Sequence, residues 1–308
     1  MFQTHGNVQI KLESLEGESY NDTEDLDKFG KGREMYYFTG HSSLDIFLEK
    51  IGQLLFPMGT YCICCGKYID ITRTYCICDQ CMDAINWGFI YIDKEEEMKE
   101  AGRTGELDSV LSCMVYGLHS RQLVFDLKYN KRTYLARPLG MIMADRLLND
   151  ESLENLVDRI DYVVPVPLHP SKFRTRGFNQ ADLISRELVK RIRENCPGKK
   201  ELRCLSWALL RARSTQAQRS VTGGERFLNL EGAFSVNPRY AEKLKGAVIL
   251  LVDDIFTTGA TADRCAGQLK ASGVAEVHFL SLATGNYYLK GSFRPRGSED
   301  FLKESSFT

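Results

Sequence analysis

The sequence lacks three features that would place it in a specialised class of protein. It has no apolar run near the ~20 residues that a membrane-spanning helix needs. Its first residues do not combine a basic start with an apolar stretch, as a signal peptide does. It also has no internal repeat. We therefore expect a cytoplasmic protein without a membrane span, whose ten cysteines stay reduced.

Net charge is also nearly absent, at −1 over 308 residues, and the hydrophobic fraction of 43% is ordinary for a soluble globular protein. This balance hides an asymmetry along the chain. Residues 1–60 carry 10 acidic against 5 basic residues, whereas residues 170–226 carry 14 basic against 5 acidic residues. An anionic partner should therefore meet the second region.

From about residue 110, apolar strand-like runs alternate with helical patterns. The expected strands are VLSCMVYG (110–117), DYVVPVPL (161–168), CLSWALL (204–210), AVILLV (247–252) and VHFLSLA (277–283). The expected helices cover about 120–129, 135–149, 178–193 and 260–271. Near-continuous apolar strands separated by helices predict an α/β fold, with a mostly parallel sheet covered by helices on both faces.

Composition divides the chain into four segments. Residues 1–43 form a polar, acidic extension that we expect to be flexible, with one strand-like run, NVQIKLES. Residues 44–108 hold an amphipathic helix (LDIFLEKIGQLLF), a cysteine-rich module and a charged linker. The α/β domain occupies 109–286, and 287–308 form a flexible tail.

The cysteine-rich module, CICCGKYIDITRTYCICDQC (62–81), contains two Cys-x-x-Cys pairs. Four thiolates in two such pairs are typical of a closed, structural zinc site, and Gly66 suits the tight turn after the first pair. The predicted ligands are Cys62, Cys65, Cys78 and Cys81. Cys64 and Cys76 lie in the same stretch, so the assignment has competitors. The remaining cysteines read as ordinary thiols; they are Cys113, Cys196, Cys204 and Cys265.

The stretch VILLVDDIFTTGAT (248–261) places two adjacent carboxylates, Asp253 and Asp254, after five apolar residues. We expect the apolar run to be a central strand and the acidic pair to mark its carboxyl end, where ligands bind in open α/β sheets. The small residues that follow lead into a helix, and such a turn exposes N–H groups that suit a phosphate. Carboxylates can accept hydrogen bonds from vicinal sugar hydroxyls. The pattern therefore predicts a sugar-phosphate site; the alternative is a solvated turn with a helix cap.

This order of strand, Asp-Asp and Thr-Thr-Gly resembles the ribose-5-phosphate motif of type I phosphoribosyltransferases. Three further stretches resemble the ComF family, competence-associated phosphoribosyltransferase-like proteins with an N-terminal four-cysteine zinc ribbon. They are LKYNKR (127–132), VPVPLHPSKFRTRGFNQADLISREL (164–188) and LLRARSTQAQRSVTGGERFLNLEGAF (209–234). The resemblance runs from about residue 44 to residue 283.

The resemblance implies that Asp253 and Asp254 bind the ribose hydroxyls of phosphoribosyl pyrophosphate (PRPP). It implies a 5-phosphate loop of Thr257, Thr258, Gly259, Ala260 and Thr261, and a pyrophosphate loop of Pro167, Leu168 and His169. His169 reads as a polar loop residue rather than a base. A basic clamp for the diphosphate would include Lys172, Arg174 and Arg176, and Mg²⁺ is expected with PRPP. The loop that closes over the substrate would carry further cations, namely Arg211, Arg213, Arg219 and Arg226.

Three functions stay open on the sequence. The chain could transfer phosphoribosyl from PRPP to an acceptor that the sequence does not reveal. It could instead be a single-stranded-DNA-binding protein of the DNA-uptake machinery, with its basic face along the strand. A third alternative is a regulator that senses PRPP with an inactive site. The resemblance implies a role in natural transformation in each case.

Overall fold

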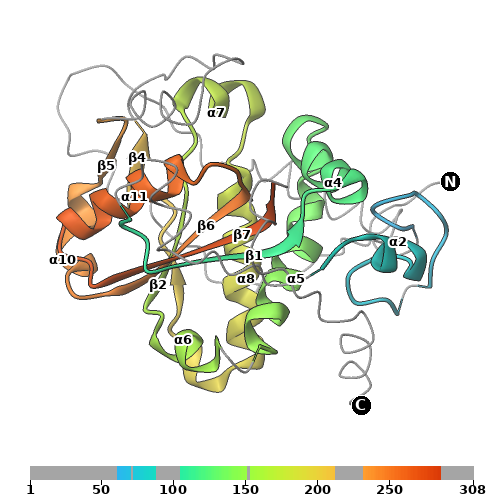
Figure 1. The fold of residues 1–308 in the computed structure, drawn as a ribbon, viewed down its shortest axis with the longest axis horizontal. Helices are drawn as coiled ribbons and strands as arrows, with labels where there is room; N and C mark the ends of the chain where they lie inside the picture. Colours follow the sequence, from blue (N-terminus) through green and yellow to red (C-terminus); the bar gives the residue numbers. More distant parts are fainter. Residues whose placement is uncertain (1–60, 71, 88–104, 151–152, 212–231, 286–308) are drawn as a thin grey trace, which may run out of the picture. The chain divides into compact units, whose positions relative to one another are not determined.

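The computed structural model describes residues 61–70, 72–87, 105–150, 153–211 and 232–285 (Figure 1). These residues all belong to one of two units, residues 55–308. The amphipathic helix and the strand-like run expected before residue 60, and the tail after 286, lie outside the described residues. Among the residues described, no helix is long and apolar enough to cross a membrane.

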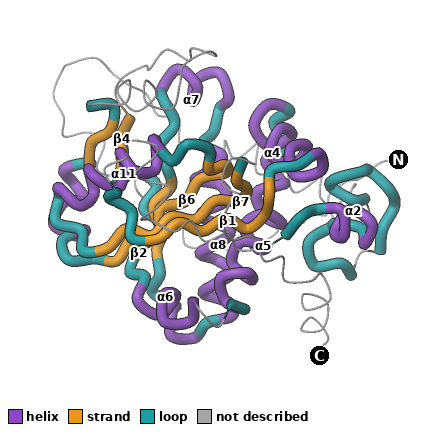
Figure 2. The backbone as a smooth tube through the Cα atoms, in the orientation of Figure 1, coloured by secondary structure: helices purple, strands orange, loops and turns teal. Residues whose placement is uncertain are grey.

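Five parallel strands form the main sheet in the order β1-β7-β6-β2-β3. They are β1 (Ser109–Val115), β2 (Tyr162–Pro165), β3 (Arg203–Cys204), β6 (Val248–Phe256) and β7 (Glu276–Thr284). Figure 2 shows them side by side, with helices around them. Two short strands, β4 (Leu209–Arg211) and β5 (Phe234–Val236), form a separate antiparallel pair. The predicted fold class, a mostly parallel sheet flanked by helices, is confirmed.

Helices cover both faces of the sheet. The helices among the described residues are α2 (Asp79–Ala84), α4 (Leu118–Tyr129), α5 (Ala136–Leu148), α6 (Glu154–Arg159), α7 (Pro170–Arg176), α8 (Gln180–Asn195), α10 (Ala241–Leu244) and α11 (Ala260–Ala271). Successive side chains of a strand point to opposite faces of the sheet. Strand β6 therefore contributes residues to two hydrophobic cores, one on each face. Leu250 and Val252 pack with residues of α4, α5 and α8, whereas Ile249 and Leu251 pack with residues of α11.

This arrangement places a topological switch point between β2 and β6. The chain leaves β2 through α7 and α8 on one face to reach β3, and leaves β6 through α11 on the other face to reach β7. The loops after β2 and β6 therefore leave two adjacent strands toward opposite faces of the sheet. Ligands of open α/β sheets bind in the crevice that such divergence leaves at the carboxyl edge.

Three sequence expectations need correction. The run CLSWALL is not one strand: β3 ends at Cys204, a turn closes with Ala208 N–H donating to the Leu205 carbonyl, and β4 starts a different sheet. The strand expected to end before the acidic pair runs through it to Phe256, because β7 continues to pair with it there. The basic run at 170–176 forms helix α7, which the short pattern did not reveal.

Helices α5 and α8 lie very close together. A Cβ at Gly140 of α5 would stand 2.6 Å from the Glu187 Cβ and 2.8 Å from the Ile184 carbonyl of α8, so only glycine fits this crossing. The buried Asp145 of α5 joins the same pair, because it accepts two hydrogen bonds from Arg191 of α8, at 2.7 and 2.9 Å. The second oxygen also accepts the Tyr75 hydroxyl at 2.9 Å, which ties the cysteine-rich module to this helix pair.

Candidate ligand site and cysteine cluster

The acidic pair lies at the carboxyl edge of β6, beyond the end of its pairing with β2. The β2–β6 ladder ends at Pro165 and Val252, so Asp253 and Asp254 extend past β2 into the crevice at the switch point. The two side chains have different surroundings, since neighbouring residues of a strand face opposite sides. Asp254 is buried, whereas Asp253 is partly exposed.

Asp254 is held by a cation from another helix. The Lys128 ammonium, near the end of α4, lies 2.6 Å from the Asp254 Oδ2, and the two side chains are 18% and 4% exposed. Asp253 makes a local contact instead: its Oδ1 accepts the Asp254 backbone N–H at 2.8 Å. Burial, and then the charge of Asp254, raise the pKa of Asp253 well above its ordinary range. Because the Asp253 side chain is partly exposed and Asp254 is buried, Asp253 is the more accessible carboxylate of the pair.

Several cations gather around this crevice. Loss of surrounding water lowers the pKa of Lys172 on α7, and the positive charges of three neighbours add to the effect. These neighbours are Arg211, Arg176 and Lys128. The Arg211 guanidinium lies 5.0 Å from the Phe234 ring centre. Burial lowers the pKa of Arg211, and the negative charge of Asp253 acts in the opposite direction, so the two side chains interact electrostatically. Cations that crowd one another next to a carboxylate edge form a site suited to a polyanion.

The loop after β6 leads into α11 through a glycine cap. Gly259 adopts a left-handed backbone (φ 72°) at the cap of α11, and Ala260 is buried directly behind it. Thr257 is exposed, while Thr258 and Thr261 are partly exposed. The first turn of α11 thus points its N–H groups and positive dipole end at the same edge as the acidic pair.

His169 serves as a helix cap. Its Nδ1 accepts the Ser171 backbone N–H at 3.2 Å at the start of α7, and it lies 2.7 Å from the Ser171 hydroxyl. Burial lowers the pKa of His169, followed by the charges of Arg211 and Arg174. The structure thus gives His169 a local role as the cap of α7.

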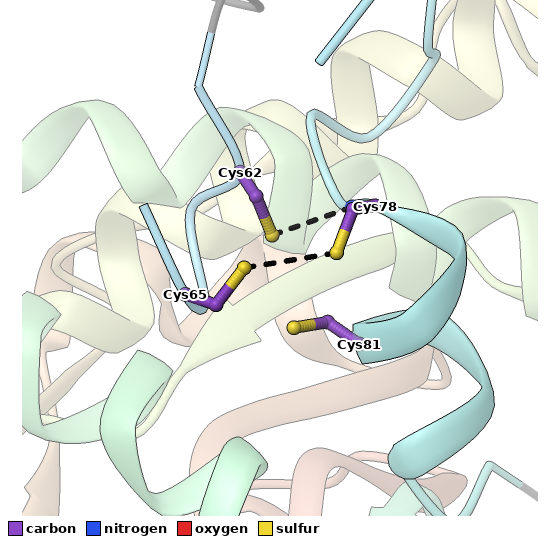
Figure 3. A group of neighbouring side chains, drawn as sticks. All are labelled: Cys62, Cys65, Cys78 and Cys81. Atoms are coloured by element: carbon purple, nitrogen blue, oxygen red, sulfur yellow. Dashed lines mark hydrogen bonds between the residues drawn. The ribbon is translucent and has the colours of Figure 1, made fainter. Parts of the chain in front are cut away.

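The four predicted metal ligands converge in one cluster (Figure 3). The sulfur atoms of Cys62, Cys65, Cys78 and Cys81 all lie within 4.8 Å of one another. Those of Cys65 and Cys78 are 3.7 Å apart. A tetrahedral zinc site with Zn–S bonds near 2.3 Å requires sulfur–sulfur separations of about 3.8 Å.

Local backbone geometry builds this cluster. Gly66, in a left-handed conformation (φ 72°), closes the first turn by donating its N–H to the Cys62 carbonyl at 2.9 Å. The second pair flanks the start of α2, where Cys78 is the cap and Cys81 is buried. Cys64 and Cys76 are not part of the four-sulfur group that could hold an ion.

No family model matches the chain. Over 161 residues it is 27% identical to Competence protein F of Haemophilus influenzae, a match that covers 52% of this chain and 66% of that protein. Over 160 residues it is 30% identical to the DNA utilization protein YhgH of Escherichia coli K12, covering 52% and 65%. The matches thus span just under two thirds of these relatives. The chain is therefore similar, over about half of its length, to proteins named for competence and for DNA utilization.

Solved structures similar to this chain include an amidotransferase and a phosphoribosyltransferase. One is glutamine PRPP amidotransferase from B. subtilis in complex with ADP and GMP, with a TM-score of 0.30, 16% identity and coverage of 47% of this chain and 25% of that chain. The other is adenine phosphoribosyltransferase from Leishmania donovani, with a TM-score of 0.28, 11% identity and coverage of 58% and 80%. At such scores, the fold class rests on the sheet topology described above.

Most residues predicted for the site lie at the carboxyl edge around β2 and β6. Arg219, together with Arg213 and Arg226 of the same stretch, lies outside the described residues. Sequence reasoning did not single out Lys128 or Asn179 as site residues. Lys128 belongs to the LKYNKR stretch, so the motif was visible, but its contact with Asp254 depends on a strand, β6, more than a hundred residues away in sequence.

Proposed function

We propose that the protein binds PRPP with Mg²⁺ at the carboxyl edge of β2 and β6, and transfers its phosphoribosyl group to an acceptor. The observation that carries this proposal is the convergence of three elements at the switch point. They are an accessible carboxylate at Asp253, a glycine-capped helix start at Gly259, and a group of cations on α4, α7 and β4. A sugar with phosphates at both ends matches this order of charges.

Each part of PRPP has a fitting neighbour. Asp253 would accept hydrogen bonds from the ribose hydroxyls, and the 257–261 loop would hold the 5-phosphate. The loop after β2, with Lys172 and Arg176, would hold the diphosphate. Asp254 has a different role, because its ion pair with Lys128 fixes that ammonium beside the crevice.

The chemistry follows from this placement. The bond between ribose C1 and the diphosphate oxygen breaks, the oxygen keeps the bonding electrons, and the acceptor forms the new bond to C1. Mg²⁺, when bound, neutralises charge on the departing pyrophosphate. The chain's own cations stabilise the same charge, and Asp253 holds the ribose in place while positive charge develops on it.

We also propose that the four-cysteine cluster holds one structural zinc ion. The sulfur separations fit a tetrahedral site, and four cysteine ligands leave no open position for chemistry. The protein should contain about one zinc per chain by elemental mass spectrometry. Cys65→Ala, Cys81→Ala protein should lose the ion, and Cys64→Ala should keep it. Stoichiometric zinc in the double variant would contradict the assignment.

The relatives' names support a role in the use or uptake of DNA, and binding of single-stranded DNA is a second candidate function. Phe125 and Tyr129 of α4 are 44% and 63% exposed, with ring centres 4.9 Å apart. The Arg176 guanidinium lies 5.4 Å from the Tyr129 ring centre. Exposed rings beside cations are suited to stacked bases and phosphates. A steep fall of DNA affinity with salt, reduced in Tyr129→Ala protein, would favour this function; no affinity at low salt would remove it.

Calorimetric titration of PRPP and Mg²⁺ tests the main proposal. Asp253→Asn should weaken PRPP binding about tenfold or more, because two charge-assisted hydrogen bonds are lost. Thr258→Val should weaken it through the phosphate loop. Asp161→Asn is the matched control, since Asp161 accepts the Val248 N–H at 2.8 Å at the opposite end of β6. Equal PRPP affinity of wild type and Asp253→Asn protein would refute the site.

Turnover needs a separate measurement. PRPP-dependent release of pyrophosphate should be assayed against a panel of bases, nucleotides and single-stranded DNA. Release that depends on one acceptor class identifies the reaction. PRPP binding without release under any of these conditions would favour the sensor function over the transferase.

A further inference from the structure

The segment between β2 and α8, residues 167–178, forms an arm whose central helix, α7, packs little against the rest of the fold, whereas Pro167 is buried and Phe178 packs against the core at its ends. It begins with the expected pyrophosphate loop, continues as α7, and carries Lys172, Arg174 and Arg176. None of the seven residues of α7 is buried, so apolar packing does not fix its position. Gly177, with φ 88°, ends the helix and turns the chain back toward the sheet.

One side chain joins the two ends of this arm. The Asn179 Nδ2 donates to the carbonyl of Val166, the residue directly before the arm, at 3.0 Å. The Asn179 Oδ1 accepts the Ala181 N–H at 3.2 Å and so caps α8. A single amide therefore closes the base of the arm and starts the following helix.

Both anchor points of this contact are firm. The Val166 N–H donates to the Val252 carbonyl at 2.8 Å, which fixes Val166 to β6. Helix α8 buries Ala181 and Ile184 completely, and its Arg191 makes two hydrogen bonds to Asp145. Asn179 therefore ties a weakly packed arm to two rigid elements.

We propose that Asn179 is a positioning residue for diphosphate binding: it clasps the base of the basic arm so that the pyrophosphate loop and its cations are held over the crevice. This inference rests on the proposed PRPP function, and specifically on the assignment of the diphosphate to the arm. Asn179 acts through the backbone of Val166 and does not itself need to touch the ligand.

Asn179→Ser separates the two hydrogen bonds. Serine caps a helix about as well as asparagine, is neutral, and is too short to reach the Val166 carbonyl. The chain offers a matched control in Asn237, which caps a short helix through Arg239 N–H at 3.1 Å and donates to the Trp207 carbonyl at 3.1 Å. Asn237→Ser removes the same donor outside the basic arm.

Hydrogen exchange and ligand titration test the clasp together. In Asn179→Ser protein, amide exchange across 167–178 should rise about two- to tenfold, the expected effect of one lost hydrogen bond. Affinity for pyrophosphate with Mg²⁺ should fall by a similar factor, while affinity for ribose 5-phosphate, held at the β6 loop, stays unchanged. Asn237→Ser protein should match wild type in all three measurements.

These outcomes distinguish the positioning role of Asn179 from the proposed PRPP function on which it rests. Unchanged exchange across 167–178 in Asn179→Ser protein overturns the clasp. Faster exchange with equal losses of both ligands, or with no loss of pyrophosphate, overturns the positioning role. Wild-type protein that binds no pyrophosphate at all contradicts the proposed function, while the exchange result still decides whether the clasp exists.

Discussion

Replacing Lys128 with methionine should destabilise the fold far more than the loss of an ordinary surface charge. The change keeps most of the side-chain volume and leaves the Asp254 carboxylate, only 4% exposed, without its cation. Removing one partner of a buried ion pair costs about 3–5 kcal/mol. Because the Lys128 side chain keeps 18% of its exposure, we expect the lower end of this range, about 3 kcal/mol. This corresponds to a change of about 150-fold in the folding equilibrium.

Urea denaturation followed by circular dichroism at neutral pH measures this cost. Adding Asp254→Asn to Lys128→Met should recover most of the lost free energy, since no unpaired charge remains buried. Lys270→Met is the control: its ion pair with Asp108 spans 3.0 Å between side chains 27% and 26% exposed, and should be worth less than about 1 kcal/mol. A Lys128→Met cost below about 1 kcal/mol, or no recovery in the double variant, would refute the reasoning.

Three further predictions concern stability. Gly140→Ala should cost about 2 kcal/mol in denaturation experiments, because the added Cβ meets the backbone of α8, whereas Gly198→Ala, with nothing within 4 Å, should be neutral. Asp253→Asn should raise the melting temperature at pH 7, because the pKa of the Asp253 carboxyl is raised in the folded state. The protonated Asp253 side chain stabilises the fold fully below pH 3.8, its ordinary pKa, and this stabilisation is lost as the pH rises. The advantage of the variant over wild type should therefore disappear in acid, and a lower melting temperature at pH 7 would contradict the pKa direction. Tyr75→Phe should cost about 1 kcal/mol by loss of the hydrogen bond to Asp145, and a neutral variant would show that this bond does not help to hold the cysteine module.

The elements that sequence reasoning found most accurately are those with a strong local pattern. The helix expected over 260–271 has those bounds, and the helix expected over 135–149 runs from Ala136 to Leu148. Apolar periodicity over three turns leaves little choice of structure. The prediction of one strand over CLSWALL was wrong for the opposite reason, since an apolar stretch of that length fits a strand or a turn between two strands. Only the partner strand decides which.

The residues of the candidate sites also divide into those that a local pattern predicts and those that only tertiary contacts identify. Two Cys-x-x-Cys pairs predict four converging sulfurs because the spacing within each pair already sets its geometry, and the order of strand, Asp-Asp and Thr-Thr-Gly predicts a carboxylate edge beside a helix start. What the sequence by itself determined is therefore the type of each local site. Tertiary structure alone decided that Lys128 neutralises Asp254 and leaves Asp253 accessible, and that Asn179 closes the basic arm onto Val166. These contacts join different elements, so they depend on how the sheet and helices pack, and no local pattern encodes them.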